Sequence, residues 1–136
     1  MISFNYETNF SLKNEAKIMD WIGDVISREG CSEGDINFVF CDDVYLHKLN
    51  VEFLKHDTLT DIISFDNSVG KELHGDIFIS VERVKENAHI FNVGFDDELN
   101  RVMVHGILHY CGYTDKSDSD SALMREKEDL YLMALL

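Results

Sequence analysis

The stretch DIISFDNSVGKELHGDIFISV, residues 61–81, decides which kind of sheet this chain builds. Its two ends, 61–66 and 76–81, are rich in isoleucine and phenylalanine, which is typical of buried strands. The connection between them, NSVGKELHG, carries turn residues at both ends. Because this connection is short enough for a hairpin, we expect the two strands to pair antiparallel within a mixed sheet.

Further elements are expected on both sides of this hairpin. Toward the N-terminus, 2–7 and 36–41 have the patterns of strands. A helix is expected between them, with Ser11 as its N-cap and Gly30 at its end. The remaining helices are expected after Asp42 or Asp43, over 82–92, from Asp96 or Asp97 to about Cys111, and over 122–136.

This order of elements, β-α-β-α-β-β-α-α-α, predicts an α+β fold with about four strands in one mixed sheet and about five helices. The chain has 136 residues, of which 45% are hydrophobic, and it contains no proline and no linker-like tract. We therefore expect a single domain over 1–136. Cys31, Cys41 and Cys111 show no paired spacing and are expected to be free thiols.

Charge and hydropathy narrow the class of protein. The formal net charge of −14 works against non-specific nucleic-acid binding, since phosphates are anionic. The N-terminal residues MISFNYETNF lack the pattern of a secretory signal, and no apolar run is long enough to cross a bilayer. We expect a cytoplasmic protein without a membrane partner.

The segment HGILHYCGYTD, residues 105–115, differs from the fold-building sequence around it. His105 and His109 are one helical turn apart, so their imidazoles project from the same face and can share one metal ion. Gly112 permits the bend that ends a helix, and Asp115 follows where a third ligand could return to the ion. Taken alone, the histidine pair has an alternative interpretation, in which both residues are half-buried and hydrogen-bonded and bind no metal. The glycine and aspartate at matched offsets favour the metal site, near the C-terminus at a helix turn.

The spacing H-x3-H-x2-G-x2-D matches the metzincin zinc motif at all but two positions. Gly106 stands where those peptidases carry their general-base glutamate, and Asp115 stands where they carry a third histidine. Three protein ligands leave a coordination position for water, as in catalytic zinc sites. We therefore expect one Zn²⁺, with Ni²⁺, Fe²⁺ or Mn²⁺ as alternatives, and a metal-bound water rather than an assigned side chain as the catalytic group.

Three segments together resemble the YbeY family of metal-dependent endoribonucleases. They are HGILHYCGYTD with Met124 and Glu128 after it, LNVEFLKHDTLTDIISFD at 49–66, and LHGDIFIS at 73–80. The resemblance runs from Asn50 to about Glu128, with the segments in the family's order. It implies a single-strand endoribonuclease that acts in ribosomal RNA maturation, at the 3′ end of the small-subunit RNA, and in ribosome quality control. It implies ribosomal RNA and ribosome-associated proteins as partners.

The resemblance also assigns residues. His105 and His109 match the family's first two metal ligands, and Asp115 takes the place of the third, which is usually a histidine. The family's loop carries an arginine thought to contact RNA, where this chain has Leu54. The adjacent Lys55 and His56 could substitute for it as substrate-binding cations, or they could be solvated loop residues.

Two other functions stay open on the sequence alone. The first is a zinc metallopeptidase-like hydrolase, which the histidine spacing favours and Gly106 opposes. The second is a non-catalytic ribosome-assembly factor with a structural metal, which the acidic charge and Leu54 favour. RNA binding would need cations that converge in space, and the candidates are scattered along the sequence: Lys55, Lys71, Arg83, Lys85 and Arg101.

Overall fold

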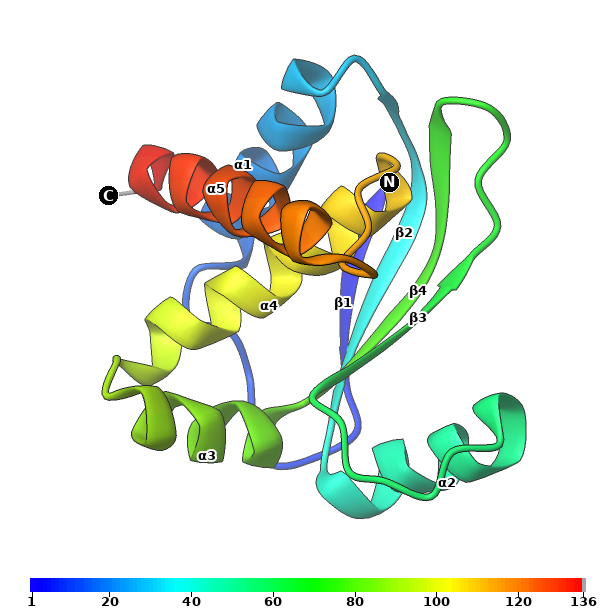
Figure 1. The fold of residues 1–136 in the computed structure, drawn as a ribbon, viewed down its shortest axis with the longest axis vertical. Helices are drawn as coiled ribbons and strands as arrows, with labels where there is room; N and C mark the ends of the chain where they lie inside the picture. The colour runs from blue at the N-terminus through cyan, green and yellow to red at the C-terminus, as the bar shows by residue number, and fades with distance from the viewer. Residues whose placement is uncertain (136) are drawn as a thin grey trace.

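The computed structural model describes residues 1–135, and these form one four-stranded sheet and five helices (Figure 1). The elements follow in the order β1 (Ile2–Tyr6), α1 (Glu15–Arg28), β2 (Ser32–Cys41), α2 (Asp43–Leu54), β3 (Ile62–Asp66), β4 (Glu72–Ser80), α3 (Val81–Phe91), α4 (Phe95–Tyr110) and α5 (Asp118–Ala134). The predicted order and the α+β class are confirmed. Residue 136, where the last helix was expected to end, lies outside the described residues.

The sheet is mixed, as the hairpin predicted. Its strand order is β1-β2-β4-β3, with β1 and β4 both parallel to β2, and β3 antiparallel to β4. The hairpin register pairs Ile62 with Ile79 and Asp66 with Gly75. A strand cannot follow its parallel neighbour through a tight turn, so α1 crosses over between β1 and β2.

Alternation along the strands directs two sets of side chains to opposite faces. Ile77 and Ile79 of β4 belong to the main core, which lies between the sheet and the helices α1, α4 and α5. Phe78, between them, points to the other face and packs in a smaller cluster with Leu46 of α2. Figure 1 shows the same division, with α2 on the side of the sheet away from α4 and α5.

Both central strands begin earlier than the composition predicted. β2 starts at Ser32 rather than 36, and β4 starts at Glu72 rather than 76. The reason is tertiary: Ser32 pairs with Glu72 and Glu33 with Leu73, so polar residues join the ladder through backbone hydrogen bonds.

The expected helix starts were partly wrong. Asp42 is the N-cap of α2 as expected, and its side chain accepts a hydrogen bond from the Tyr45 N–H. However, Asn14 rather than Ser11 precedes α1, and Gly94 precedes α4. Asp96 and Asp97 lie inside the first turn of α4, where their charges favour the positive end of the helix dipole. α5 begins at Asp118 instead of 122, because the Ser117 hydroxyl accepts a hydrogen bond from the Asp120 N–H.

None of the helices in the described chain is long and apolar enough to cross a membrane.

Candidate metal centre

The last turns of α4 and the loop after it bring the two histidines and the aspartate together. His105 and His109 lie one turn apart on α4, and their Nε2 atoms are 3.0 Å apart. Gly112 has a φ of 108°, in a region that residues with a Cβ rarely adopt, so the backbone bends there. The Asp115 Oδ2 atom thereby comes to 3.7 Å from His105 Nε2 and 3.9 Å from His109 Nε2. The three residues singled out by their spacing are neighbours in space.

The distances within this cluster suit one transition-metal ion. Zinc–ligand bonds of about 2.0–2.1 Å in a tetrahedral arrangement separate two ligand atoms by about 3.3 Å. The three observed separations, 3.0, 3.7 and 3.9 Å, bracket that value. About half of the Asp115 side chain is exposed (52%), compared with 22% for His105, so the cluster is open on the aspartate side. These residues can therefore hold an ion and leave part of its coordination sphere accessible.

Both imidazoles are oriented through their Nδ1 atoms. His105 Nδ1 lies 2.7 Å from Glu128 Oε2 of α5, and His109 Nδ1 lies 3.0 Å from the Tyr113 carbonyl oxygen. Because a carbonyl and an ionised carboxylate only accept, each Nδ1–H must donate. Each Nε2 lone pair is then free to bind a metal. Such partners fix the tautomer and the orientation of metal-binding histidines.

The pKa values follow from burial and charge. Burial lowers the pKa of His105, but the hydrogen bond and charge of Glu128 outweigh it, so the net shift is upward. Burial works in the other direction on Glu128, and its bonds to His105 and Arg101 outweigh it and lower its pKa. The pKa of His109 is lowered by burial and by the nearby His105. His109 is therefore the histidine that is neutral more readily and so more available as a ligand.

A cavity of about 310 Å³ adjoins the cluster, and its walls carry two acids that the motif does not contain. Burial raises the pKa of Asp61, which precedes β3. Burial and then the charge of Asp61 raise the pKa of Glu98, in the first turn of α4. Asp61 lies in the segment 49–66 that resembles the family, and the sequence did not single out Glu98. Its spacing could have done so, since Glu98 is seven residues, about two turns, before His105.

Lys55 and His56, the cations expected to bind substrate, lie at the end of α2 and do not line this cavity. Lys55 is the left-handed C-cap of α2, and its ammonium donates to the Glu52 carbonyl oxygen. The His56 N–H donates to the Asn50 carbonyl oxygen. Both side chains are exposed, so their role in binding RNA stays a prediction.

Gly106 allows α4 to lie close against the sheet. A Cβ at this position would stand 3.1 Å from Ile62 Cδ1 and 3.2 Å from Ile77 Cδ1. A side chain here would therefore enter the core between α4 and the sheet, not the metal centre. The position that holds the base in the peptidase motif could not present a glutamate to the metal in this fold.

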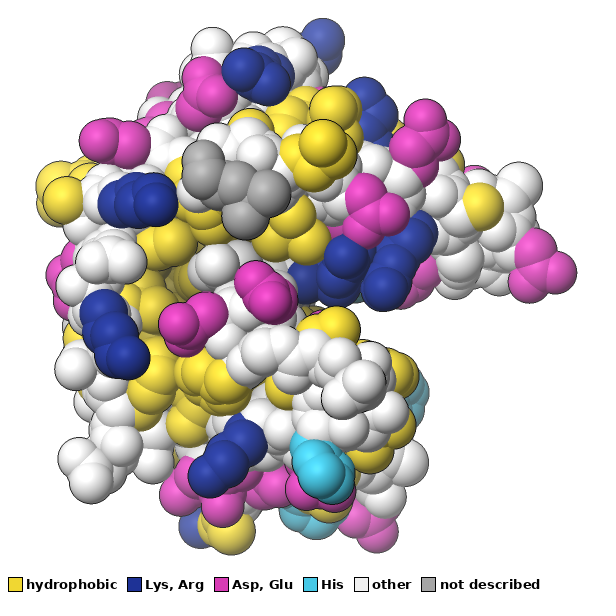
Figure 2. Space-filling view, turned by 90° about the vertical axis from the view of Figure 1, so that its left-hand side faces the viewer, with side chains coloured by type: hydrophobic (Ala, Val, Ile, Leu, Met, Phe, Trp, Pro, Cys, Tyr) yellow, Lys and Arg dark blue, Asp and Glu magenta, His cyan; other side chains and the backbone are white. Residues whose placement is uncertain are grey.

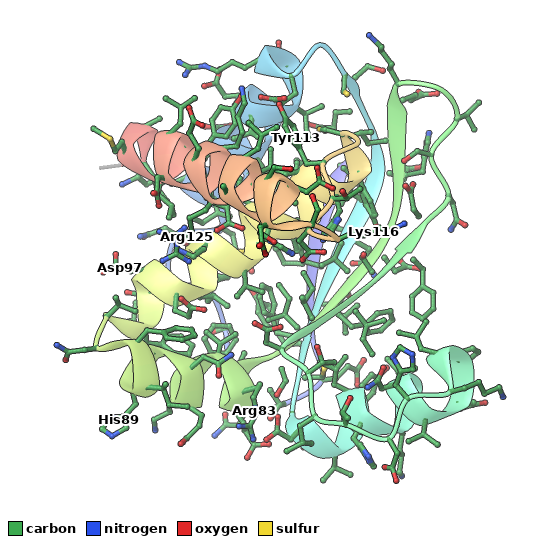
Figure 3. The ribbon with its side chains drawn as sticks, in the orientation of Figure 1. Arg83, His89, Asp97, Tyr113, Lys116 and Arg125 are labelled. Atoms are coloured by element: carbon green, nitrogen blue, oxygen red, sulfur yellow. The ribbon has the colours of Figure 1, made fainter. Side chains whose placement is uncertain are left out.

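The loop that carries Asp115 is tied to two other elements. The Tyr113 hydroxyl donates to Glu29 Oε1 after α1 at 2.6 Å, and the Thr114 hydroxyl donates to Asp120 Oδ2 of α5 at 2.8 Å. Figure 3 shows Tyr113 and Lys116 on this loop, in front of the end of α4. Tyr110, by contrast, is buried and donates to the Phe65 carbonyl oxygen, which braces α4 against the hairpin.

The chain is an α+β protein in which α4 and α5 cover a mixed sheet. Its candidate metal centre has three ligands, which lie at the end of α4 and in the loop after it. The family model described as "Endoribonuclease YbeY" matches residues 2–136. The chain belongs to this family, as its resemblance in the sequence indicated.

Individual relatives agree over nearly the full length. Proteins named "Endoribonuclease YbeY" from Flavobacterium johnsoniae and Flavobacterium psychrophilum are 67% and 60% identical to this chain. Each alignment covers 95% of this chain; it covers 93% of the Flavobacterium johnsoniae protein and 92% of the Flavobacterium psychrophilum protein. A Thermotoga maritima protein solved in solution has a similar fold, with a TM-score of 0.75 and 29% identity over 99% of this chain and 89% of its own.

Proposed function

We propose that this protein is a metal-dependent endoribonuclease that hydrolyses phosphodiester bonds in RNA, with His105, His109 and Asp115 as the metal ligands and zinc as the ion. The observation that carries the proposal is an open three-ligand cluster beside a cavity, in a chain that belongs to the endoribonuclease family YbeY. The resemblance in the sequence extends the proposal to single-stranded ribosomal RNA, at the 3′ end of the small-subunit RNA, and to ribosome quality control.

The chain's own residues prepare the site for this chemistry. Glu128 and the Tyr113 carbonyl hold both imidazoles with Nε2 facing the centre. A bound divalent ion supplies a Lewis acid and lowers the pKa of water. Asp61 and Glu98, whose pKa values burial raises, line the adjoining cavity and hold a proton more readily than exposed carboxylates do.

The geometry opposes the two other functions. A peptidase of the matching motif needs a glutamate at position 106, and there the backbone lies against Ile62 and Ile77. A structural zinc site is closed by four protein ligands, whereas Asp115 stands on an open side and the group of metal-ligand side chains found among the described residues has three members. An endoribonuclease centre accounts for both features.

The test removes one ligand and compares it with a histidine elsewhere. His109→Ala is expected to abolish cleavage of a single-stranded RNA that matches the small-subunit 3′ end, because two ligands hold the ion too weakly. His89→Ala is the matched control, since His89 is exposed in the last turn of α3 and points away from the centre (Figure 3). Casein cleavage is measured in parallel and is expected to be absent.

Three results would contradict the proposal. The first is RNA cleavage by His109→Ala at the wild-type rate. The second is casein cleavage by the zinc-loaded protein, which would point to a peptidase. The third is an inactive wild-type protein whose melting temperature falls sharply on chelation, which would point to a structural metal. Metal-free melting curves of both variants are recorded to confirm that each is folded.

A further inference from the structure

We propose that Arg125 on α5 binds a phosphate of the RNA backbone at the mouth of the cavity beside the metal cluster. This inference deepens the proposed function and rests on it. It concerns a residue that the sequence did not single out, and it is carried by the charges that line the cavity.

The cavity is acidic and needs a cation to accept an anionic backbone. Four of its lining residues are carboxylates: Asp61, Glu98, Asp115 and Glu128. A divalent ion offsets two of these charges. Without further positive charge, the remaining carboxylates would repel a phosphate at short range.

Two arginines, Arg101 and Arg125, line the cavity. Arg101 is already neutralised, because its Nη1 atom lies 2.8 Å from Glu128 Oε1 and its Nη2 atom lies 2.6 Å from Asp129 Oδ1. Its side chain is only 18% exposed. The guanidinium of Arg101 therefore holds Glu128 in place behind His105 and is not free for a substrate.

Arg125 has the opposite surroundings. It is exposed, and among residues 1–135 it forms no ion pair or side-chain hydrogen bond. It lies one helical turn before Glu128, so it projects from the same side of α5 toward α4. Figure 3 shows it between the two helices. Its charge lowers the pKa of Glu98, which is consistent with a position over the cavity.

The guanidinium of Arg125 has the geometry and charge to bind a phosphate. Its planar set of N–H donors can form two parallel hydrogen bonds to phosphate oxygens, and it stays charged at every working pH. The other cations weighed from the sequence are elsewhere: Arg83 pairs with Asp43, and Lys55 caps α2. In Figure 2, basic side chains gather at the edge of a hollow. Acidic side chains are scattered over the rest of the face shown. Of the two arginines that line the cavity, Arg125 is thus the one without an ion pair among the described residues.

The experiment compares Arg125→Gln, Arg125→Lys and Arg28→Gln in the zinc-loaded protein. Arg28 is the matched control: it is an exposed arginine near the end of α1, it pairs only with Asp24 among the described residues, and its loss changes the net charge equally. Arg125→Gln is expected to raise KM for single-stranded RNA about tenfold, as the loss of one charge-assisted hydrogen bond does, with a smaller effect on kcat. Arg125→Lys is expected to restore part of the loss. Arg28→Gln is expected to leave KM unchanged.

A binding measurement separates this inference from the proposed function. Fluorescence anisotropy of a short, non-cleavable RNA analogue with the zinc-loaded protein gives the dependence of log K on log salt concentration. Arg125→Gln is expected to reduce its slope by about 0.7, the value for one phosphate contact with a single strand. If the wild type cleaves RNA but Arg125→Gln has wild-type KM and slope, or if Arg28→Gln changes both equally, the inference is wrong and the proposed function stands. If the wild type neither cleaves nor binds RNA, both are wrong.

Discussion

At the scale of single residues, one carboxylate connects the metal centre to the rest of the protein. Glu128 is buried, accepts a hydrogen bond from His105 Nδ1, and receives the Arg101 guanidinium on its other oxygen. The negative charge makes the imidazole a stronger base and holds its Nε2 toward the centre. Glu128 therefore acts through His105, as a positioning residue, and not on the substrate.

Glu128→Gln keeps the shape of this side chain and removes its charge. We expect the affinity for zinc to fall about 10- to 100-fold, the usual effect of removing a partner of a metal-binding histidine. Competition with a chelator of known affinity measures the change. Asp129→Asn is the control, because Asp129 also binds Arg101 but does not contact His105. Equal zinc affinities in the wild type and Glu128→Gln would show that the carboxylate does not support the ligand.

At the scale of elements, the position of the α4–α5 loop depends on one acid beyond the end of α1. Glu29 accepts hydrogen bonds from the hydroxyls of Tyr113 and Tyr131 and pairs with Lys127 of α5. Burial favours its neutral form, but these three partners outweigh burial and lower the pKa of Glu29. This contact joins α1, the loop that carries Asp115, and α5.

The lowered pKa of Glu29 sets the direction of a pH effect. A carboxyl group whose pKa is lower when folded stabilises the protein above its unfolded value of 4.5, and the contribution is lost as pH falls through the folded value. We expect Glu29→Gln to reduce the free energy of unfolding at pH 7 by about 1.5–3 kcal/mol. The gap from the wild type should narrow below about pH 4.5. Urea unfolding across this pH range measures both.

Glu15→Gln is the matched control for this prediction. Glu15 also accepts a hydrogen bond from a tyrosine hydroxyl, that of Tyr6, but the contact is exposed. Its replacement should change the free energy of unfolding by less than about 1 kcal/mol. A gap for Glu29→Gln that stays constant down to pH 3 would show that charge plays no part in this contact.

At the scale of the whole molecule, the main core connects the metal-bearing helices to the sheet in one unit. Residues of α1, α4 and α5 pack together with residues of β1, β2 and β4 in one cluster. Trp21, the single tryptophan, is buried in it, and its Nε1–H donates to the Tyr131 carbonyl oxygen of α5 at 2.9 Å. We therefore propose that 1–136 folds as one metal-dependent hydrolase domain.

One domain implies one unfolding transition. Tryptophan fluorescence, which reports the contact between α1 and α5, and far-ultraviolet circular dichroism should give the same melting temperature. Zinc at about 100 times its Kd should stabilise the wild type by about 2.7 kcal/mol and shift both curves together. The shift should persist in His89→Ala and disappear in His109→Ala. Two separate midpoints, or a zinc shift in one signal alone, would indicate independent units.

The sequence by itself determined what depends on neighbours along the chain. Helical periodicity placed His105 and His109 on one face, and Gly112 indicated the bend that returns Asp115 to them, because one turn of helix and one left-handed residue fix that geometry locally. The hairpin at 61–81 likewise established the mixed sheet.

Only the tertiary structure decided what surrounds the three ligands. Asp61 precedes β3, Glu98 lies on α4 and Arg125 lies on α5, and no local pattern relates the three. Lys55 and His56, which the sequence suggested as substrate-binding cations, lie at the end of α2 and do not line the cavity. The ends of β2 and β4 also depended on pairing between distant residues. The physical reason is the same in each case: a helix orients its own side chains, whereas a cavity and its charge arise only when separate elements pack around one core.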